Sequence, residues 1–253
     1  MILVAALAIG LLYGALLRRG WAPAVALHRR WERARPTLWR YISSSPATFI
    51  YLGIVIITTW VLLGLGPSLA KAVLEAHSSN LDHLRTDPLR VLIRSAFWVD
   101  SYALLPWVVV LAVALAPAER WLGTKRWLVA FLIGHVGATL LTALGLWVAI
   151  RTGRAGSNLE GTVDVGFSYG FAAIAALFTY RLSGRLRVRW AVALVALVLA
   201  GAAIGHTFTD FGHLVAVAIG FALWPLTREP NRRVGPDDHT PGRIWLPEPP
   251  ATP

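Results

Sequence analysis

Long apolar runs alternate along the chain with short segments that contain charged residues, glycine or proline. A helix that crosses a membrane needs roughly 20 mostly apolar residues, and each of these runs approaches or reaches that length. The first run is slightly short, so a tilted or partly inserted helix is the alternative there. The predicted spans are residues 2–17, 47–65, 95–116, 127–150, 163–180, 190–205 and 207–226.

The segments outside these runs set the expected organisation. Residues 18–46 contain seven Arg with interleaved Trp and Tyr, which favours a basic segment at the cytoplasmic membrane interface. Residues 67–87 predict a loop with an amphipathic helix on the outer leaflet. The tail from Thr227 is rich in Pro and charge without an apolar period, so we expect disorder. Three regions follow: 1–46 with the first helix and the basic segment, 47–226 as the membrane core, and 227–253 as a cytoplasmic tail.

The distribution of basic residues predicts the topology, because basic segments stay on the cytoplasmic side. Most Lys and Arg lie in segments 18–46, 119–126, 181–189 and 228–243. The extracytoplasmic segments are then 67–94, 151–162 and 205–208. In this topology the fifth and seventh spans both enter the membrane from the outside.

Composition supports the same class of protein. Apolar residues make up 56% of the chain, charged residues only 15%, and 12 residues are Trp. This favours an all-α, polytopic transmembrane helical bundle over a soluble domain. The net charge of +11 comes from Arg between the apolar runs, which indicates contact with the lipid bilayer and argues against nucleic acid as a partner. The chain has no Cys, and its His and carboxylates lack metal-binding spacing, so we expect no metal and no cofactor.

Two polar residues inside the apolar runs are the candidate chemistry. Ser168 lies about five residues into the fifth span and His213 about six into the seventh, so both should lie within roughly 10 Å of the outer surface. A serine hydroxyl becomes a nucleophile when a base takes its proton, and a neutral His is the usual base near pH 7. The pair predicts a serine hydrolase within the membrane.

Each polar residue also has a purely structural interpretation. Gly166-x-x-x-Gly170 is a helix-packing motif, and Ser and His often only form hydrogen bonds between membrane helices. Asp210 lies one turn before His213, where it would either orient the imidazole ring or start the helix. Asp164 is expected to cap a helix. His135, in the fourth span, is expected to be a buried, hydrogen-bonded histidine.

Several motifs together resemble the rhomboid family of intramembrane serine proteases, most closely its divergent bacterial rhomboid-like membrane proteins. Glu119-Arg-Trp-Leu-Gly123 is similar to the E-x-x-x-G turn of that family, and Gly166-Phe-Ser168 to its G-x-S motif. His213, followed by Ala216 and Gly220, is similar to the histidine of its last helix. The resemblance implies a six-helix core plus one N-terminal helix, in a bacterial inner (plasma) membrane. It also implies Ser168 as nucleophile, His213 as base, and membrane proteins with single transmembrane helices as substrates or partners.

The chain departs from the family pattern around the serine. Tyr169 stands where the proteases have Gly, and Ala172 where they have an aromatic residue that packs on the histidine. The second core helix has apolar residues, among them Ala103 and Trp107, instead of His and Asn that bind the oxyanion. The Ser168 backbone N–H remains as a donor, and the supporting candidates are Gly166, Asp210, Asn158, Asn80 and Asp100. Two hypotheses stay open: an intramembrane serine protease, or an inactive pseudoprotease that binds the membrane helices of partner proteins.

Overall fold

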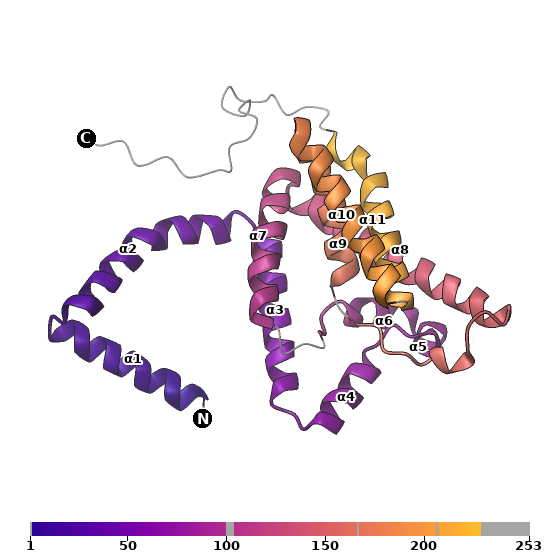
Figure 1. Cartoon of the computed structure of the whole chain (residues 1–253). Coiled ribbons are helices and arrows are strands. Elements are labelled where there is room, and N and C mark those ends of the chain that lie inside the picture. The colour runs from indigo at the N-terminus through magenta and orange to yellow at the C-terminus, as the bar shows by residue number, and fades with distance from the viewer. Residues whose placement is uncertain (1, 100–103, 166, 206, 229–253) are drawn as a thin grey trace. The chain divides into compact units, whose positions relative to one another are not determined.

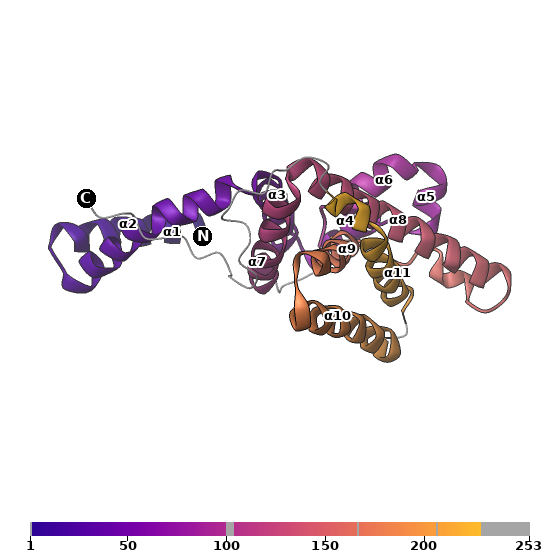
Figure 2. The same ribbon diagram turned by 90° about the horizontal axis from the view of Figure 1, so that it is seen from above.

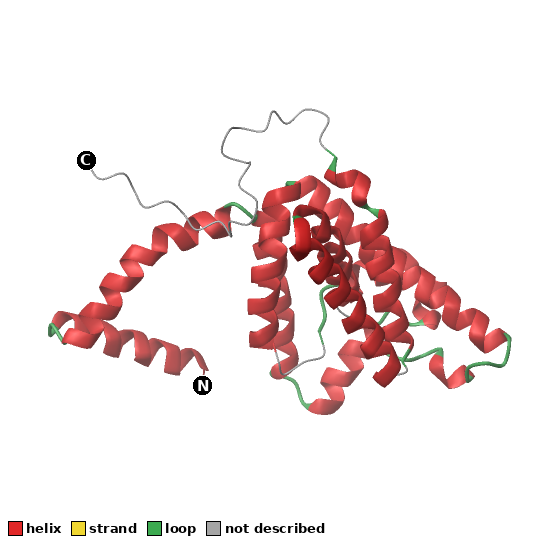
Figure 3. Cartoon of the chain, turned by 45° about the horizontal axis from the view of Figure 1, so that its top comes forward, coloured by secondary structure: helices red, strands yellow, loops and turns green. Residues whose placement is uncertain are grey.

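The computed structural model describes residues 2–99, 104–165, 167–205 and 207–228. Within these ranges the chain forms helices joined by short loops, without a strand, so the all-α prediction is confirmed (Figure 3). The predicted tail lies outside the described residues from 229 onward. The chain divides into two units, one with residues 1–44 and the other beginning at Ser45.

The first unit is a pair of helices, α1 (Ile2–Arg18) and α2 (Ala22–Ser43) (Figure 1). Gly20 lies between them with a φ of 66°, a left-handed conformation that glycine adopts without steric cost. Helix α1 is almost entirely apolar and ends in Arg18, whereas α2 contains apolar and basic residues. The composition of α1 therefore suits an apolar environment, whereas that of α2 suits an environment that is apolar on one side and polar on the other.

The second unit contains several long helices together with shorter ones. Its α-helices are α3 (Pro46–Leu63), α4 (Pro67–Ala76), α5 (Leu81–Thr86), α6 (Pro88–Ser95), α7 (Leu104–Leu122), α8 (Thr124–Arg151), α9 (Ser168–Phe178), α10 (Gly184–Gly205) and α11 (Phe208–Ala222). Short 3-10 helices lie at η1 (Ser157–Leu159), η2 (Thr179–Arg181) and η3 (Trp224–Thr227). By length and composition α3, α8 and α10 can cross a membrane. Large apolar side chains are exposed along all three, among them Ile57, Trp60, Leu132, Leu144, Val192 and Leu197, which is the surface that lipid covers.

Long-range hydrogen bonds explain two of the predicted helix starts that are wrong, those of α7 and α9. The third span was expected to begin at Ser95, but Ser95 ends α6. The carbonyl oxygens of Ala96 and Phe97 accept hydrogen bonds from Tyr51 and Thr58 of α3, at 2.6 and 2.7 Å, instead of continuing the helix. The fifth span was expected from residue 163, but α9 begins at Ser168 because the preceding backbone pairs with the loop before α5.

Helix α9 lies at the centre of the second unit and contacts α7, α8, α10 and α11 (Figure 2). It is only 11 residues long, and Ala172–Leu177 are all buried. Its small side chains allow close approach, since a Cβ at Gly134 of α8 or Gly220 of α11 would collide with Ala173. A helix enclosed in this way by other helices needs less length and apolar surface than one that faces lipid.

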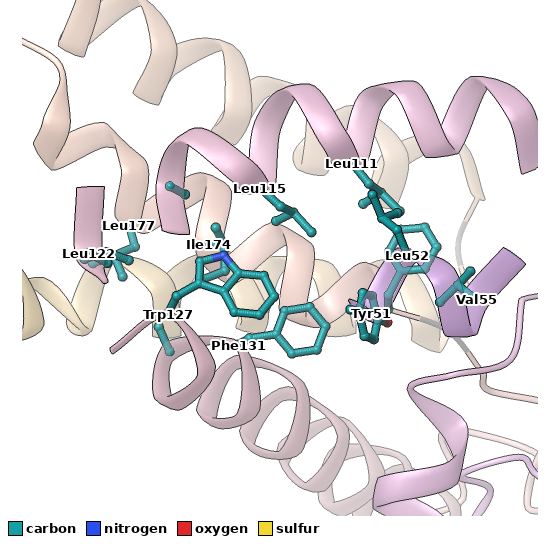
Figure 4. Close-up of a cluster of buried hydrophobic side chains, with 13 residues drawn as sticks. Tyr51, Leu52, Val55, Leu111, Leu115, Leu122, Trp127, Phe131, Ile174 and Leu177 are labelled. Atoms are coloured by element: carbon teal, nitrogen blue, oxygen red, sulfur yellow. The ribbon is translucent and has the colours of Figure 1, made fainter. Parts of the chain in front are cut away.

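Larger side chains fill the other side of α9. Trp127 and Phe131 of α8 stack at 5.3 Å between ring centroids, and Tyr51 of α3 meets Phe131 edge to face (Figure 4). Leu111 and Leu115 of α7 complete the cluster with almost no exposed surface. This cluster fixes α9 relative to α3, α7 and α8.

A buried carboxylate joins three helices at one end of the unit. Glu119 is 1% exposed, near the end of α7. Its Oε1 and Oε2 accept hydrogen bonds from the backbone N–H groups of Ala47 and Thr48, at 3.0 and 2.7 Å, in the first turn of α3. Oε1 also accepts a hydrogen bond from the Thr124 hydroxyl at the start of α8. Gly123 follows with a φ of 79°, so the Glu119–Gly123 turn caps α3 and reverses the chain.

Candidate functional site

Helices α9 and α11 run side by side in the same direction. Near their starts, a Cβ at Gly212 would collide with the Tyr169 ring, and near their ends a Cβ at Gly220 would collide with Ala173. Ser168 directly precedes Tyr169, and His213 directly follows Gly212. Ser168 and His213 therefore lie at the same level of two packed helices.

Tyr169 provides the direct contact between the two helices at this level. Its ring meets the His213 imidazole edge to face, with 5.2 Å between centroids and 72° between planes. The Tyr169 side chain is buried, whereas Ser168 and His213 are each partly exposed. Tyr169 therefore points into the protein and does not cover the exposed part of Ser168. Within the described part of the chain, no hydrogen bond joins Ser168 to His213.

The start of α11 fixes the surroundings of His213. The Thr209 backbone lies one turn before His213 and close to its ring. Asp210 takes the helix-start role: its Oδ2 accepts hydrogen bonds from the Thr207 backbone N–H and hydroxyl, at 3.0 and 2.6 Å, and Thr207 caps the Asp210 N–H in return.

Asp164 has a different role from the one expected. Helix α9 has Phe167 at its N-cap position, without a side-chain cap, so Asp164 does not cap it. Asp164 Oδ2 accepts a hydrogen bond from the Ser79 hydroxyl at 3.2 Å, and Oδ1 accepts one from the Tyr169 hydroxyl at 3.4 Å. The Asp164 backbone N–H donates to the Ser78 hydroxyl at 2.8 Å. Asp164 therefore joins the loop before α5 to the ring that contacts His213.

The Asp164 carboxyl lies in the loop before α9 and is 8% exposed. Burial raises its pKa to about 6, and the hydrogen bonds from Ser79 and Tyr169 oppose this rise because they favour the ionised form. The carboxyl therefore titrates close to neutral pH.

A small cavity adjoins Asp164. Ser79, Leu81, Thr139, Thr142 and Asp164 are among the residues that line it, and it has room for about one water molecule. The hydroxyls of Thr139 and Thr142 are buried on α8 without a hydrogen-bond partner among the described residues. Buried hydroxyls usually have a partner, so a polar occupant such as water suits this cavity.

The remaining predicted residues either lie outside the described part of the chain or form no hydrogen bond with Ser168 or His213 within it. Gly166 and Asp100 lie outside the described residues, as do Ala103 and the side chain of Trp107. Asn158 is exposed in η1, and among the described residues no hydrogen bond connects it to Ser168 or His213. Asn80 caps α5 by accepting a hydrogen bond from the His83 N–H at 2.9 Å.

His135 is buried, and its Nε2 lies 3.1 Å from the Leu92 carbonyl, so the expectation of a buried, hydrogen-bonded histidine is confirmed. Among the described residues, no group of three or more His, Asp or Glu side chains is placed to hold a metal ion. The chemistry available at this site is therefore that of a hydroxyl, an imidazole and a carboxyl.

Sequence reasoning missed the two residues that connect Ser168 and His213 to the rest of the protein. Tyr169 was noted as a departure from a motif, and Asp164 as a helix cap. One signal for their contact was available: Tyr169 and Gly212 stand at matched depth in the predicted spans, and a glycine leaves room for a ring. The Ser79 contact had no such signal, because it joins residues far apart in the sequence.

The described helices and their exposed apolar faces define a helical membrane protein that crosses the bilayer more than once. Residues 40–233 match the family model of the rhomboid-like proteins, and the chain belongs to that family. The family was therefore correctly predicted from the motifs. No curated protein and no solved structure matches the chain.

Proposed function

We propose that this protein is an intramembrane serine protease that cleaves the membrane spans of other, single-span proteins. Ser168 is the nucleophile and His213 the general base. The observation that carries the proposal is the placement of both residues at one level of α9 and α11, each partly exposed, with the His213 ring packed on Tyr169.

The expected reaction follows from the surroundings of each group. The unprotonated ring nitrogen of a neutral His213 takes the proton of the Ser168 hydroxyl while Oγ attacks the substrate carbonyl. The imidazolium then gives this proton to the leaving amine, and an acyl-enzyme forms. A water molecule, deprotonated by His213, releases the acid and restores Ser168. Catalytic hydrogen bonds are often long before substrate binds, so the missing Ser168–His213 bond is compatible with this role.

The first turn of α9 offers oxyanion donors in place of the missing His and Asn. The backbone N–H groups of Ser168, Tyr169 and Gly170 have no acceptor within the helix, as in any first turn. They also lie at the positive end of the helix dipole. Two such donors supply an oxyanion hole of the kind that typically contributes about 10²–10³ in rate per donor.

The same fold supports the predicted topology with α3 and α7–α11 as a six-helix core and α1 as an additional helix. Trp121, within the basic 119–126 segment, contacts Phe178 at 5.9 Å between ring centroids, and Phe178 contacts Trp190, which directly follows the basic 181–189 segment. The two basic segments thus share one end of the unit. At the other end, the Leu81 backbone N–H donates a hydrogen bond to the Glu160 carbonyl and so joins two segments predicted to be extracytoplasmic. We place the protein in a bacterial plasma membrane, with its active site near the outer surface.

A fluorophosphonate probe tests the proposal, because it labels only activated serines. We expect labelling of the detergent-purified wild type and loss of labelling in Ser168→Ala and in His213→Ala. Ser157→Ala, which removes an exposed loop serine, should label normally. Equal labelling of Ser168→Ala and wild type, or none in folded wild type, would overturn the assignment.

A pseudoprotease is the second candidate, and the lack of a Ser168–His213 hydrogen bond among the described residues favours it. In this case the protein binds a partner's membrane helix without cutting it. Ser168→Ala would then retain photo-crosslinking to a single-span membrane protein with unchanged yield, and the wild type would leave that protein intact.

A further inference from the structure

Helix α2 has a continuous apolar line that the described protein leaves uncovered. Leu27, Trp31, Ala34 and Leu38 recur every three or four residues and therefore lie on one face. Leu27, Trp31 and Leu38 are 58%, 50% and 43% exposed, and Ala34 is exposed as well. In water such a line of leucine and tryptophan would be unfavourable, so it needs an occupant.

Basic side chains surround this line. At 100° per residue, Arg30 and Arg35 lie on its two flanks, while Arg29, Arg33 and Arg40 share the opposite face. The helix contains five Arg but a single acidic residue, Glu32, which forms an exposed ion pair with Arg35 at 3.9 Å. The face around the apolar line is therefore strongly cationic.

We infer that α2 lies flat on the membrane surface and binds the headgroups of anionic phospholipids. An apolar line bordered by Arg matches the boundary between acyl chains and headgroups, since Trp and Leu enter the apolar layer and Arg reaches the phosphates. Arg29, Arg33 and Arg40 face water and attract the negative leaflet over a longer distance. A second copy of this chain fits less well, because it would bring two sets of five Arg together. The inference is independent of the chemistry at Ser168.

The chain has no cysteine, so one introduced cysteine can carry a fluorophore without background. Leu38→Cys places the label on the apolar line, and Thr37→Cys places it on the neighbouring polar side at the same height. The full-length protein is placed in nanodiscs of zwitterionic phosphatidylcholine, with or without anionic phosphatidylglycerol. Brominated acyl chains then quench any fluorophore that enters the apolar layer.

In discs with phosphatidylglycerol we expect quenching at position 38 to exceed quenching at position 37 severalfold. The difference should shrink in pure phosphatidylcholine and in Arg30→Gln/Arg35→Gln. Arg29→Gln/Arg33→Gln loses the same charge on the far face of α2. This variant should retain more of the difference in quenching between positions 38 and 37. Equal quenching at positions 37 and 38 would overturn the inference that α2 lies on the bilayer. Equal quenching at position 38 in both lipids would overturn its preference for anionic headgroups.

Discussion

The Tyr169 ring lies edge-on against the His213 imidazole, 5.2 Å away between centroids. In the proteases that the sequence resembles, an aromatic residue one turn after the serine packs on the histidine, and this chain has Ala172 at that position. The aromatic contact comes instead from the residue next to Ser168. Because consecutive helix residues point about 100° apart, Tyr169 faces α11 while Ser168 faces a neighbouring direction. The ring thus stabilises the position of His213 without occupying the exposed side of Ser168.

Replacing Tyr169 tests whether this packing matters. Tyr169→Ala removes the ring, and since an aromatic pair contributes about 0.5–1.5 kcal/mol, we expect fluorophosphonate labelling to slow roughly 3- to 10-fold. Tyr169→Phe keeps the ring and should label within about twofold of wild type. Tyr180→Phe, which removes a hydroxyl that donates to the Phe221 carbonyl, is the matched control. Unchanged labelling of folded Tyr169→Ala would show that the ring does not position the base.

Asp164 predicts how stability depends on pH. Its folded-state pKa of about 6 lies above the ordinary value of 3.8, so the folded protein binds more protons than the unfolded chain between these values. Stability should therefore fall as pH rises from about 4 to about 6 and change little above that. The contribution of this group is on the order of 3 kcal/mol.

Asp164→Asn removes the titration and keeps a group of the same shape. Thermal unfolding in detergent, followed at pH 4.5 and pH 7, should show a smaller difference for Asp164→Asn than for wild type. Asp82→Asn changes an exposed aspartate on α5 and serves as the control. If wild type and Asp164→Asn lose the same stability across this range, Asp164 does not titrate there.

Glu119 should be a main source of stability at the junction of α3, α7 and α8. Glu119→Ala leaves the buried backbone N–H of Thr48 and the part-buried backbone N–H of Ala47 without this acceptor, at about 1–3 kcal/mol for the buried group and less for the other. Glu119→Gln keeps one acceptor oxygen and should therefore lower the stability less than Glu119→Ala does. The midpoint of thermal unfolding measures both, with Glu75→Ala as the control, since Glu75 is exposed and forms a surface ion pair with Lys71. A midpoint for Glu119→Ala as high as that of Glu75→Ala would contradict the capping role.

The apolar pattern located the lipid-facing helices because their signal is local. The runs 47–65 and 127–150 agree within a few residues with α3 and α8. Residues 190–205 gave the end of α10 but missed its first turns, where Arg alternates with apolar residues. An apolar sequence pattern detects helices whose side chains face lipid, and these three helices are exposed along most of their length. The pattern therefore located them.

The start of α9 and the contacts of Asp164 could not be read in this way. Ser79 and Asp164 are 85 residues apart, and no local sequence pattern around either residue predicts their hydrogen bond. The charge pattern placed Ser168 and His213 at comparable depth, but which side chain faces α11 depends on how the helices pack. Gly212 and Tyr169 decide this, through a fit that only the fold reveals.

The close packing of α9 and α11 gives the last prediction. A Cβ at Gly220 would collide with the Ala173 carbonyl and the Ala176 side chain, so Gly220→Ala must push the two helices apart. We expect a loss of roughly 1–3 kcal/mol in stability, and slower probe labelling because His213 moves with α11. Gly53→Ala is the matched control, since nothing lies within 4 Å of its Cβ on α3 and alanine favours a helix by up to about 1 kcal/mol. The midpoint temperature of thermal unfolding and the rate of probe labelling should therefore both fall in Gly220→Ala and stay at their wild-type values in Gly53→Ala. Should Gly220→Ala unfold at the wild-type temperature, α9 and α11 are not in the close contact described.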